Sequence, residues 1–486
     1  TALAYVGRDA AAVEVLVHVP REGAADTGLP IPLLLRLADL PVQATLCFSA
    51  TGETWPYRRR RSGAPSALFL FPGPIHPVSL GSHRRAITLL TAMLAVGFDI
   101  TLLYSGSNRE MRSQAEPFLR LLAVETHAFS NQRDKIRMLR VGLRRKVHQL
   151  IGGRISEDIP ESFVERRLLR NNRHLRQALL NLDLSRFDIA IISYAWMTGA
   201  FDGLSRGPLL VCDTHDVQYH RAGGARAPRT TLGKLLLGSD SDKRAEIASL
   251  KRMDYVLAIS ARDRDLLVKD LDAGKVLLAC SSVGYASKPI RPRPAHAPFV
   301  FGFVGHDMAA NALALQVIFD EWWPAIRAWS PESRLVIAGS ICRAPVCTKG
   351  AFLDDAVELA GFVPDLGAFY DRIDVMLSPV VVPGGFNYKN GEALAAGLSL
   401  ITNKLGAEAL KPIDVDHVVD SDADLMAVLR HIELEPDAEL ARRMRLQRRA
   451  LEALQSTDAL ELVRDAALTR GALPFLKTKS QRKATR

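Results

Sequence analysis

The chain has 486 residues, which allows roughly two to four domains. Its composition of 48% hydrophobic and 24% charged residues is typical of a folded globular protein and excludes a disordered or fibrous chain. No apolar run is long enough to cross a bilayer, which argues against an integral membrane protein. The chain begins at Thr1 without a signal-peptide pattern, so we expect a fragment or a processed product.

The five cysteines are scattered and lack the paired spacing of a zinc site. Cys47, Cys212 and Cys280 fall within apolar, strand-like runs. We therefore expect buried, reduced thiols in a cytoplasmic protein.

The net charge of +10 is concentrated between residues 133 and 176. Within 135–151, apolar residues recur at helical spacing and the arginines lie mostly off that stripe. Two interpretations stay open: the helix lies against an anionic membrane surface, at the inner face of the membrane, or it is a solvated helix that packs one face on its own domain. No nucleic-acid-binding module accompanies the charge, so we expect no nucleic acid as a partner.

In chain order, residues 1–65 form an N-terminal extension to which we assign no role. It holds two strand-like runs, 13–19 and 42–49, around an apolar helical candidate at 31–40. From Ser66 onward strands alternate with helices, which predicts a parallel sheet. The expected strands are 67–71, 98–104, 188–193, 208–213, 254–260 and 275–282, with a helix at 86–97.

A proline-rich stretch at 284–298 marks an interdomain linker, and a second strand–helix series follows it. Its expected strands are 299–305, 333–340, 357–363, 374–382 and 398–402. The sequence therefore predicts an α/β protein with two Rossmann-like, doubly wound domains that face a central cleft. The expected boundaries are 66–285 for the first domain with its basic helical insertion, 286–298 for the linker, 299–430 for the second domain, and 431–486 for helices and a basic tail.

One motif, GGFNYKNGEALAAG at 384–397, lies between two apolar strands. Glycines that let a backbone approach an anion are followed by the cation Lys389 and the carboxylate Glu392 at a helix start. This order suits a phosphate-bearing ligand on a helix N-terminus. The alternative is a tight strand-to-helix turn with one solvated lysine.

The second half of the chain resembles the donor-binding half of GT-B glycosyltransferases of family 4, which are retaining, nucleotide-sugar-dependent enzymes. The resemblance lies in FVFGFVGHDMAANALAL, RLVIAGS, VELAGFVPDLGAFYDRIDVMLSPV and GGFNYKNGEALAAGLSLITNKLGAEAL. The first half is similar more loosely, through LFLFPGPIHPVSLGSHRRAITLLTAMLAVGFDITLLY, DTHDVQYHRA and MDYVLAISARDRDLL. Together these stretches cover roughly residues 66–430.

The resemblance implies a donor site whose carboxylate, Glu392, receives the ribose hydroxyls. It implies catalytic contributions from Lys389 and from His215, which follows a buried strand at its carboxyl end. Each position also has a plain structural interpretation: a turn glycine, a solvated helix-start arginine, a surface glutamate or a capping histidine. The residues expected to hold the donor are Gly305, Gly385, Phe386, Asn387, Lys389 and Glu392, with Gly81 and Arg85 facing it from the first domain.

The sequence departs from the family pattern at several points. Gly384 stands where the family often has a carboxylate, Asn387 where a subgroup has an arginine, and GHDMAANALAL lacks the usual Arg/Lys pair. A histidine often found in the first domain is also absent from SYAWM at 193–197. No cofactor and no metal are implied, because SDSD at 239–242 is expected to begin a helix.

The leading hypothesis is a retaining glycosyltransferase that moves a sugar from a nucleotide-diphosphate donor to a glycan or lipid-linked glycan of the cell envelope. The departures keep a second hypothesis open, a non-catalytic scaffold of the same fold that binds a nucleotide or a glycan. A third is a nucleotide-sugar epimerase.

Overall fold

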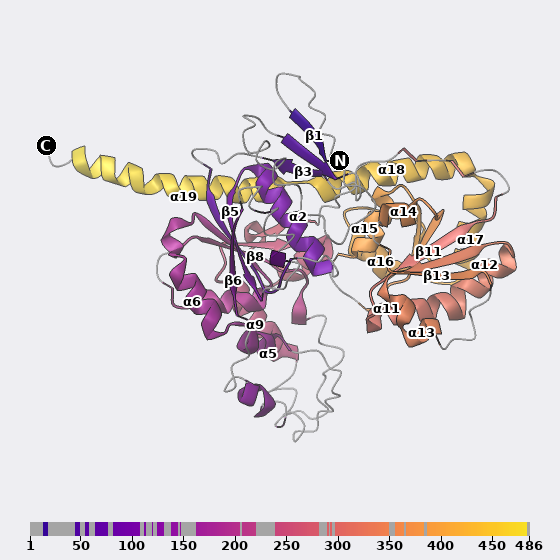
Figure 1. Cartoon of the computed structure of the whole chain (residues 1–486), viewed down its shortest axis with the longest axis horizontal. Helices are drawn as coiled ribbons and strands as arrows, with labels where there is room; N and C mark the ends of the chain where they lie inside the picture. Colours follow the sequence, from indigo (N-terminus) through magenta and orange to yellow (C-terminus); the bar gives the residue numbers. More distant parts are fainter. Residues whose placement is uncertain are drawn as a thin grey trace.

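The computed structural model contains two α/β domains side by side, joined by a long C-terminal helical segment (Figure 1). The residues that the structure describes are 13–17, 44–48, 54–57, 64–75, 81–106, 111–112, 119, 124–130, 138–143, 146, 162–204, 207–219, 239–280, 289–290, 292–293, 297–348, 355–363, 366–382 and 386–483.

The first domain is built on a seven-stranded sheet in the order β10-β9-β8-β7-β4-β5-β6, and every pairing in it is parallel. The strand order reverses between β4 and β7, as in a doubly wound sheet. Six of the strands were expected, whereas β6 was not. The strands are β4 Ser66–Phe71, β5 Asp99–Ser105, β6 Glu125–Phe129, β7 Ile189–Ser193, β8 Leu209–Asp213, β9 Tyr255–Ala258 and β10 Val276–Leu278.

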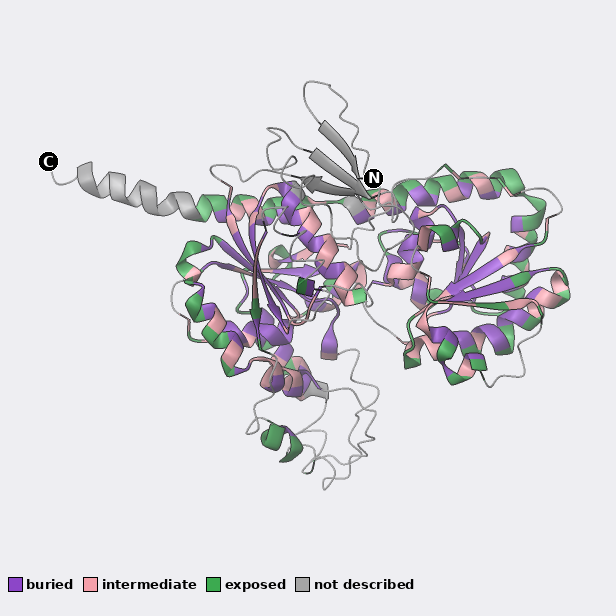
Figure 2. Cartoon of the chain, viewed as in Figure 1, coloured by how far each residue is buried: buried purple, intermediate pink, exposed green. Residues whose placement is uncertain are grey.

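Helices cover both faces of this sheet, which explains why its strands read as unbroken apolar runs. In β4, Phe69 and Phe71 pack into one core while Leu68 and Leu70 pack into the core on the opposite face. Figure 2 shows the resulting buried sheet beneath helices whose outer faces are exposed. The helices are α2 Gly81–Val96, α5 Phe163–Arg170, α6 Arg173–Asn181, α9 Ser239–Leu250 and α10 Ala261–Leu267.

The second domain repeats the plan with five parallel strands in the order β13-β12-β11-β14-β15. Here the strand order reverses between β11 and β14. The strands are β11 Val300–Val304, β12 Arg334–Ala338, β13 Val357–Gly361, β14 Val375–Ser378 and β15 Ser399–Thr402. The helices are α11 Ala309–Val317, α12 Trp323–Trp329, α13 Pro345–Thr348, α14 Leu366–Tyr370, α15 Tyr388–Ala395, α16 Lys404–Leu410 and α17 Asp422–Leu434. The two doubly wound sheets confirm the fold class expected from the sequence.

The C-terminal helices connect the two domains (Figure 1). Helix α18, Pro436–Gln455, packs on α15 of the second domain through Leu446 and Leu454. Helix α19, Asp458–Lys483, then returns to the first domain, where Val463 enters the core beside α2. Arg464 Nη1 also donates to the carbonyl of Val96, 3.1 Å away. The region 431–486 therefore divides between both domains.

The N-terminal extension contributes three strands, β1 Val13–Val17, β2 Ala44–Phe48 and β3 Thr54–Tyr57. Strand β2 pairs parallel to β1 and antiparallel to β3. The helix expected at 31–40 lies outside the described residues. Among the described helices, none combines the length and the hydropathy needed to cross a bilayer.

Candidate functional site

The strand order reverses at one point in each sheet, and we call these the switch points. The expected site residues lie near them, at the carboxyl ends of the strands. In the second domain, the loop after β11 and the loop before α15 lie at the point where the strand order reverses. Ligands of open parallel sheets bind at this position, because the loops there diverge and leave a crevice.

Lys389 and the segment after β11 meet at this switch point. The Lys389 Nζ atom lies 3.2 Å from the side-chain oxygen Oδ1 of Asn311, and 4.0 Å from the centre of the Phe303 ring. Burial lowers the pKa of Lys389 to about 7. The amino group thus contacts one amide oxygen and one aromatic face, both uncharged, and an anionic ligand would stabilise its charged form.

Three glycines lie at the ends of neighbouring strands of this sheet, where the backbone segments of adjacent strands approach each other closely. A Cβ atom on Gly305 would lie 3.0 Å from the side chain of Asn311. Gly339 has a φ of +99°, and a Cβ atom there would overlap the carbonyl oxygen of Gly305. Gly361, with a φ of +67°, accepts a hydrogen bond from the amide of Gly339 at 2.6 Å. Glycine is therefore required by packing at Gly339, whereas Gly305 is closely packed and presents a bare backbone that suits a ligand's approach.

Helix α15 carries Glu392, whose side chain is buried. Its Oε2 atom accepts a hydrogen bond of 2.9 Å from the hydroxyl of Tyr370, and its Oε1 atom lies 3.2 Å from Nε of Arg84. Arg84 belongs to α2 of the first domain, so this ion pair joins the two domains. Glu392 is therefore held in place at the interdomain contact.

The start of α15 holds the other residues expected around a diphosphate. Phe386 is buried, and its ring packs against Gly391, where a Cβ atom would come within 2.7 Å of it. Asn387 is the N-cap residue, but its side chain makes no capping hydrogen bond to the helix. Gly385, like Gly384, lies outside the described residues.

The N-terminus of α2 contacts the second domain directly. A Cβ atom built on Gly81, the first residue of α2, would lie 3.5 Å from the ring of Tyr388. Gly81 therefore faces the first residue of α15 across the domain boundary. The N-termini of two helices, with their partial positive charges, meet at this junction.

Arg85 occupies a different environment from the one expected for a phosphate-binding cation. Its guanidinium is buried and pairs with Asp213, with an Nη2 to Oδ1 distance of 2.7 Å. Burial alone would raise the pKa of Asp213, but Arg85 and then His215 outweigh it and hold that pKa well below its ordinary value. The charge of Arg85 is thus neutralised by Asp213 at the end of β8, and the ion pair holds the Asp213 carboxylate in place.

His215 lies at the same strand end, in a strained and crowded position. Its φ is +59°, and its Nε2 atom is 3.1 Å from Oδ2 of Asp213. The imidazole stacks on the ring of Tyr194, with centroids 3.9 Å apart and planes 9° from parallel. Tyr194, just after β7, has a φ of +71°, so two neighbouring residues that are not glycine both adopt left-handed backbone. Such strain persists where the surrounding structure enforces it, and it occurs frequently at functional sites.

The structure thus brings most of the expected residues to one junction. Gly81 and Arg85 lie on α2, His215 lies beside Arg85, and Lys389 and Glu392 lie on the facing helix. Arg84, in the helix-start GSHRR, was one of the residues considered from the sequence as a second cation. Several other residues that complete the arrangement were not predicted: Tyr194, Asn311, Gly339, Tyr370 and Tyr388. Of these, only Gly339, after an apolar strand, had a local signal.

Comparison with known proteins agrees with this arrangement. Residues 298–432 match the family described as Glycosyl transferases group 1. No curated protein matches the sequence. Among solved structures, sucrose-phosphate synthase from Thermosynechococcus elongatus is 16% identical, with a TM-score of 0.54 over 86% of this chain and 100% of the other.

Two further structures are similar over nearly their whole length. Anabaena HepE in complex with UDP-glucose is 12% identical, with a TM-score of 0.52, and the match covers 83% of this chain and 99% of that one. A glycosyltransferase from Rickettsia africae is 13% identical, with a TM-score of 0.53 over 86% of this chain and 99% of the other. At these identities the likeness establishes the shared fold.

Two doubly wound domains that meet through their helix N-termini define the chain as a GT-B protein. Its second domain is a glycosyl transferases group 1 domain, and the chain is a glycosyltransferase.

Proposed function

We propose that this glycosyltransferase moves a sugar from a nucleoside diphosphate sugar to a glycan or lipid-linked glycan, with retention of anomeric configuration, in cell-envelope polysaccharide synthesis. The observation that carries the proposal is the meeting of Lys389 with the loop after β11 at the switch point of the second sheet. Ligands of open parallel sheets bind at such a switch point, and the buried cation there suits a phosphate-bearing donor.

In glycosyl transfer, negative charge develops on the departing diphosphate as the anomeric bond breaks. Catalysis requires donors and cations that already point at that charge. Lys389 supplies the cation, and the first N–H groups of α15 supply donors at the positive end of a helix. Gly305 lets the backbone of the facing loop approach the same phosphates.

Glu392 is the residue we propose for the ribose. Tyr370 and Arg84 hold its carboxylate in place at the interdomain junction, and a carboxylate offers the acceptor oxygens that ribose hydroxyls need. The structure of HepE with UDP-glucose shows that a protein with this fold binds such a donor. This supports the same donor class for the present chain.

In the first domain, we propose that His215 contacts the reacting sugar. Asp213 and Tyr194 fix the imidazole from two sides, and Arg85 in turn fixes Asp213. Arg85 is thus a positioning residue, whereas Gly81 presents the N-terminus of α2 to the ligand. We nominate no protein nucleophile, because retaining enzymes that the sequence resembles do not need an obvious one.

A lipid-linked acceptor would bring the enzyme to the inner face of a membrane. Residues 138–143 are helical, and Leu139 and Leu143 are 74% and 63% exposed. Arg140 and Lys146 on the same segment are also exposed. Apolar side chains beside cations favour an anionic lipid surface, which supports the membrane interpretation of the basic segment.

The test is donor turnover over a panel of uridine, guanosine and thymidine diphosphate sugars, with proton NMR of the product to give its anomeric configuration. We expect one donor to be consumed, and Lys389→Ala to lower kcat by about 100-fold or more. Lys404→Ala, which removes an exposed lysine from the same domain, is the matched control. The proposal fails if no donor binds and Lys389→Ala changes nothing in any transfer assay.

A non-catalytic scaffold is the second candidate function, since Gly384 provides no carboxylate and residues 305–315 carry no Arg/Lys pair. This alternative predicts tight nucleotide binding without turnover on any acceptor. A nucleotide-sugar epimerase, by contrast, would convert the donor when no acceptor is present.

A further inference from the structure

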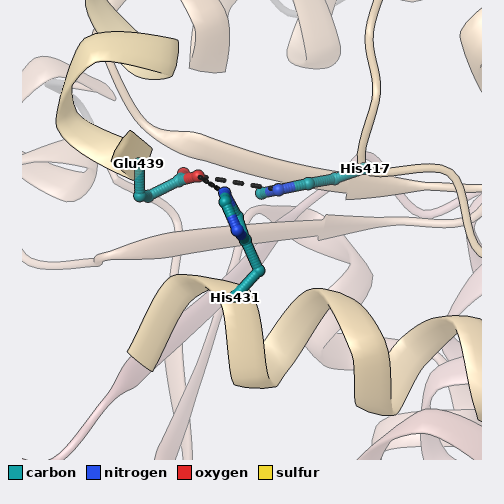
Figure 3. Close-up of side chains that lie close together, drawn as sticks. All are labelled: His417, His431 and Glu439. Carbon is teal, nitrogen blue, oxygen red and sulfur yellow. Dashed lines mark ion pairs between the residues drawn. The ribbon is translucent and has the colours of Figure 1, made fainter. Parts of the chain in front are cut away.

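A second group of polar side chains lies away from the donor junction, at the bend between α17 and α18. It consists of His417, His431 and Glu439, and we call it the elbow cluster. His417 belongs to the segment after α16, His431 to α17 and Glu439 to the first turn of α18 (Figure 3). In Figure 3 both imidazole rings approach one carboxylate oxygen.

The distances in the elbow cluster are unsuited to direct hydrogen bonds. The Nε2 atom of His417 lies 3.6 Å from Oε2 of Glu439, and that of His431 lies 3.9 Å from it. Both distances exceed the range of a hydrogen bond to oxygen. They approach the ~3.4 Å that separates ligand atoms around a tetrahedral zinc ion with bonds of about 2.1 Å. One ligand atom from each residue lies within 4.8 Å of the others.

The surroundings orient the side chains as metal ligands are oriented. The other carboxylate oxygen of Glu439, Oε1, accepts hydrogen bonds from the Ser399 hydroxyl and from Nη1 of Arg442, which also lies 3.4 Å from Oε2. Oε2 is the oxygen that faces the histidines. The Nδ1 atom of His431 lies 3.4 Å from Oε2 of Glu435, so a carboxylate stands near the ring nitrogen that would face away from a metal, as beside many ligating histidines.

The local charge also permits a cation. Arg442 and Arg445 contribute positive charges, and both pair with Asp416, at N to O distances of 2.6 and 2.9 Å. Glu435 and Glu439 place two further carboxylates beside the two imidazoles. His417 and Glu439 are buried, whereas the side chain of His431 is 32% exposed, so an ion would enter from the side of His431.

We propose that the elbow cluster binds one Zn²⁺ ion through His417, His431 and Glu439. Two imidazoles and a carboxylate are the ligand set that zinc accepts, and water completes a tetrahedron. The ion ties α17 and the segment after α16 to α18, the helix that leads back to the first domain. Its role is to stabilise this bend.

The experiment uses the full-length chain without a histidine tag, dialysed against ZnCl₂ and measured by elemental mass spectrometry and dye competition. We expect one Zn²⁺ per chain, a higher midpoint of thermal unfolding with Zn²⁺ than with EDTA, and a tetrahedral absorption spectrum with Co²⁺. His431→Ala is expected to raise Kd by more than about 100-fold, and Glu435→Gln by about 10- to 100-fold. His127→Ala is the matched control, since His127 also lies beside a carboxylate, 2.8 Å from Glu125.

Two results overturn the proposal. One is a wild-type chain that retains no Zn²⁺ in excess of the EDTA-treated protein. The other is stoichiometric Zn²⁺ that persists in His431→Ala and in Glu439→Gln, which would place the metal elsewhere. Because His431 is partly exposed, its alanine variant is expected to fold, and circular dichroism checks this before metal is added.

Discussion

The protonation state of Lys389 makes donor binding dependent on pH in a predictable direction. Burial lowers its pKa to about 7 in the ligand-free protein, so the side chain is largely neutral at pH 8.5. A bound diphosphate favours the charged form and raises the pKa again. Binding above pH 7 therefore takes up a proton, and affinity falls as the pH rises.

The size of the effect follows from linkage. If the bound-state pKa exceeds 9, the dissociation constant rises about 20- to 30-fold between pH 6 and pH 8.5 for a free-state pKa of about 7. A nucleoside diphosphate sugar is the right ligand, because both of its phosphates are esterified and keep a constant charge over this range. A free nucleoside diphosphate would add its own titration.

Isothermal titration calorimetry at several pH values, in two buffers of different ionisation enthalpy, measures both the affinity and the proton uptake. Lys389→Arg is the matched variant, because a guanidinium stays charged and should bind with little dependence on pH. A flat affinity for the wild-type chain between pH 6 and 8.5, or an equal slope in Lys389→Arg, would refute the reasoning.

Three further predictions concern the packing around the site. Arg85→Met leaves Asp213 without its main partner in a buried position, and urea denaturation should show a loss of about 3–5 kcal/mol, whereas an unchanged midpoint would contradict the pairing. In Gly339→Ala, a positive φ combines with overlap on the Gly305 carbonyl, and the free energy of unfolding should fall by about 3 kcal/mol or more. In Gly361→Ala, where the space around the new Cβ atom is open, it should fall by about 1–2 kcal/mol, and equal losses in the two variants would exclude the overlap. Glu392→Gln should weaken donor binding by about 10- to 100-fold in calorimetry, and wild-type affinity would remove Glu392 from the site.

The sequence predicted the alternating pattern of both domains well, because strands buried on both faces are apolar throughout. Strand β6, ETHAF, was missed for the complementary reason: it lies at the edge of the first sheet, and most of it is only partly buried. A strand exposed in this way carries polar residues and has no apolar run to identify it.

The site was predictable where its chemistry is local in sequence. The order glycine, lysine, glutamate at 384–392 suits an anion site, and the family resemblance favoured this interpretation over a tight turn with a solvated lysine. The ion pair between Arg84 and Glu392 has no such signal, because its partners come from different domains. The environment of Arg85 could likewise not be predicted. Arg84 and Arg85 are adjacent at the helix start and the sequence does not distinguish them, whereas in the fold Arg85 is buried against Asp213.

The elbow cluster could not be predicted from sequence motifs either. His417, His431 and Glu439 come from three separate elements, and no short zinc motif contains them. The usual local signs of a metal site are paired cysteines and acidic residues at strand ends. None of the three residues belongs to either kind of signal. The chain bends between α17 and α18, and this bend is what brings the three side chains together.

The central claim is that a nucleoside diphosphate sugar binds at the carboxyl end of the second sheet. Hydrogen–deuterium exchange, with and without each donor of the panel, tests it most directly. We expect one donor to protect residues 300–311 and 386–396, with weaker protection at the start of α2. Protection elsewhere, with these two segments unchanged, or no protection by any donor, would contradict the account.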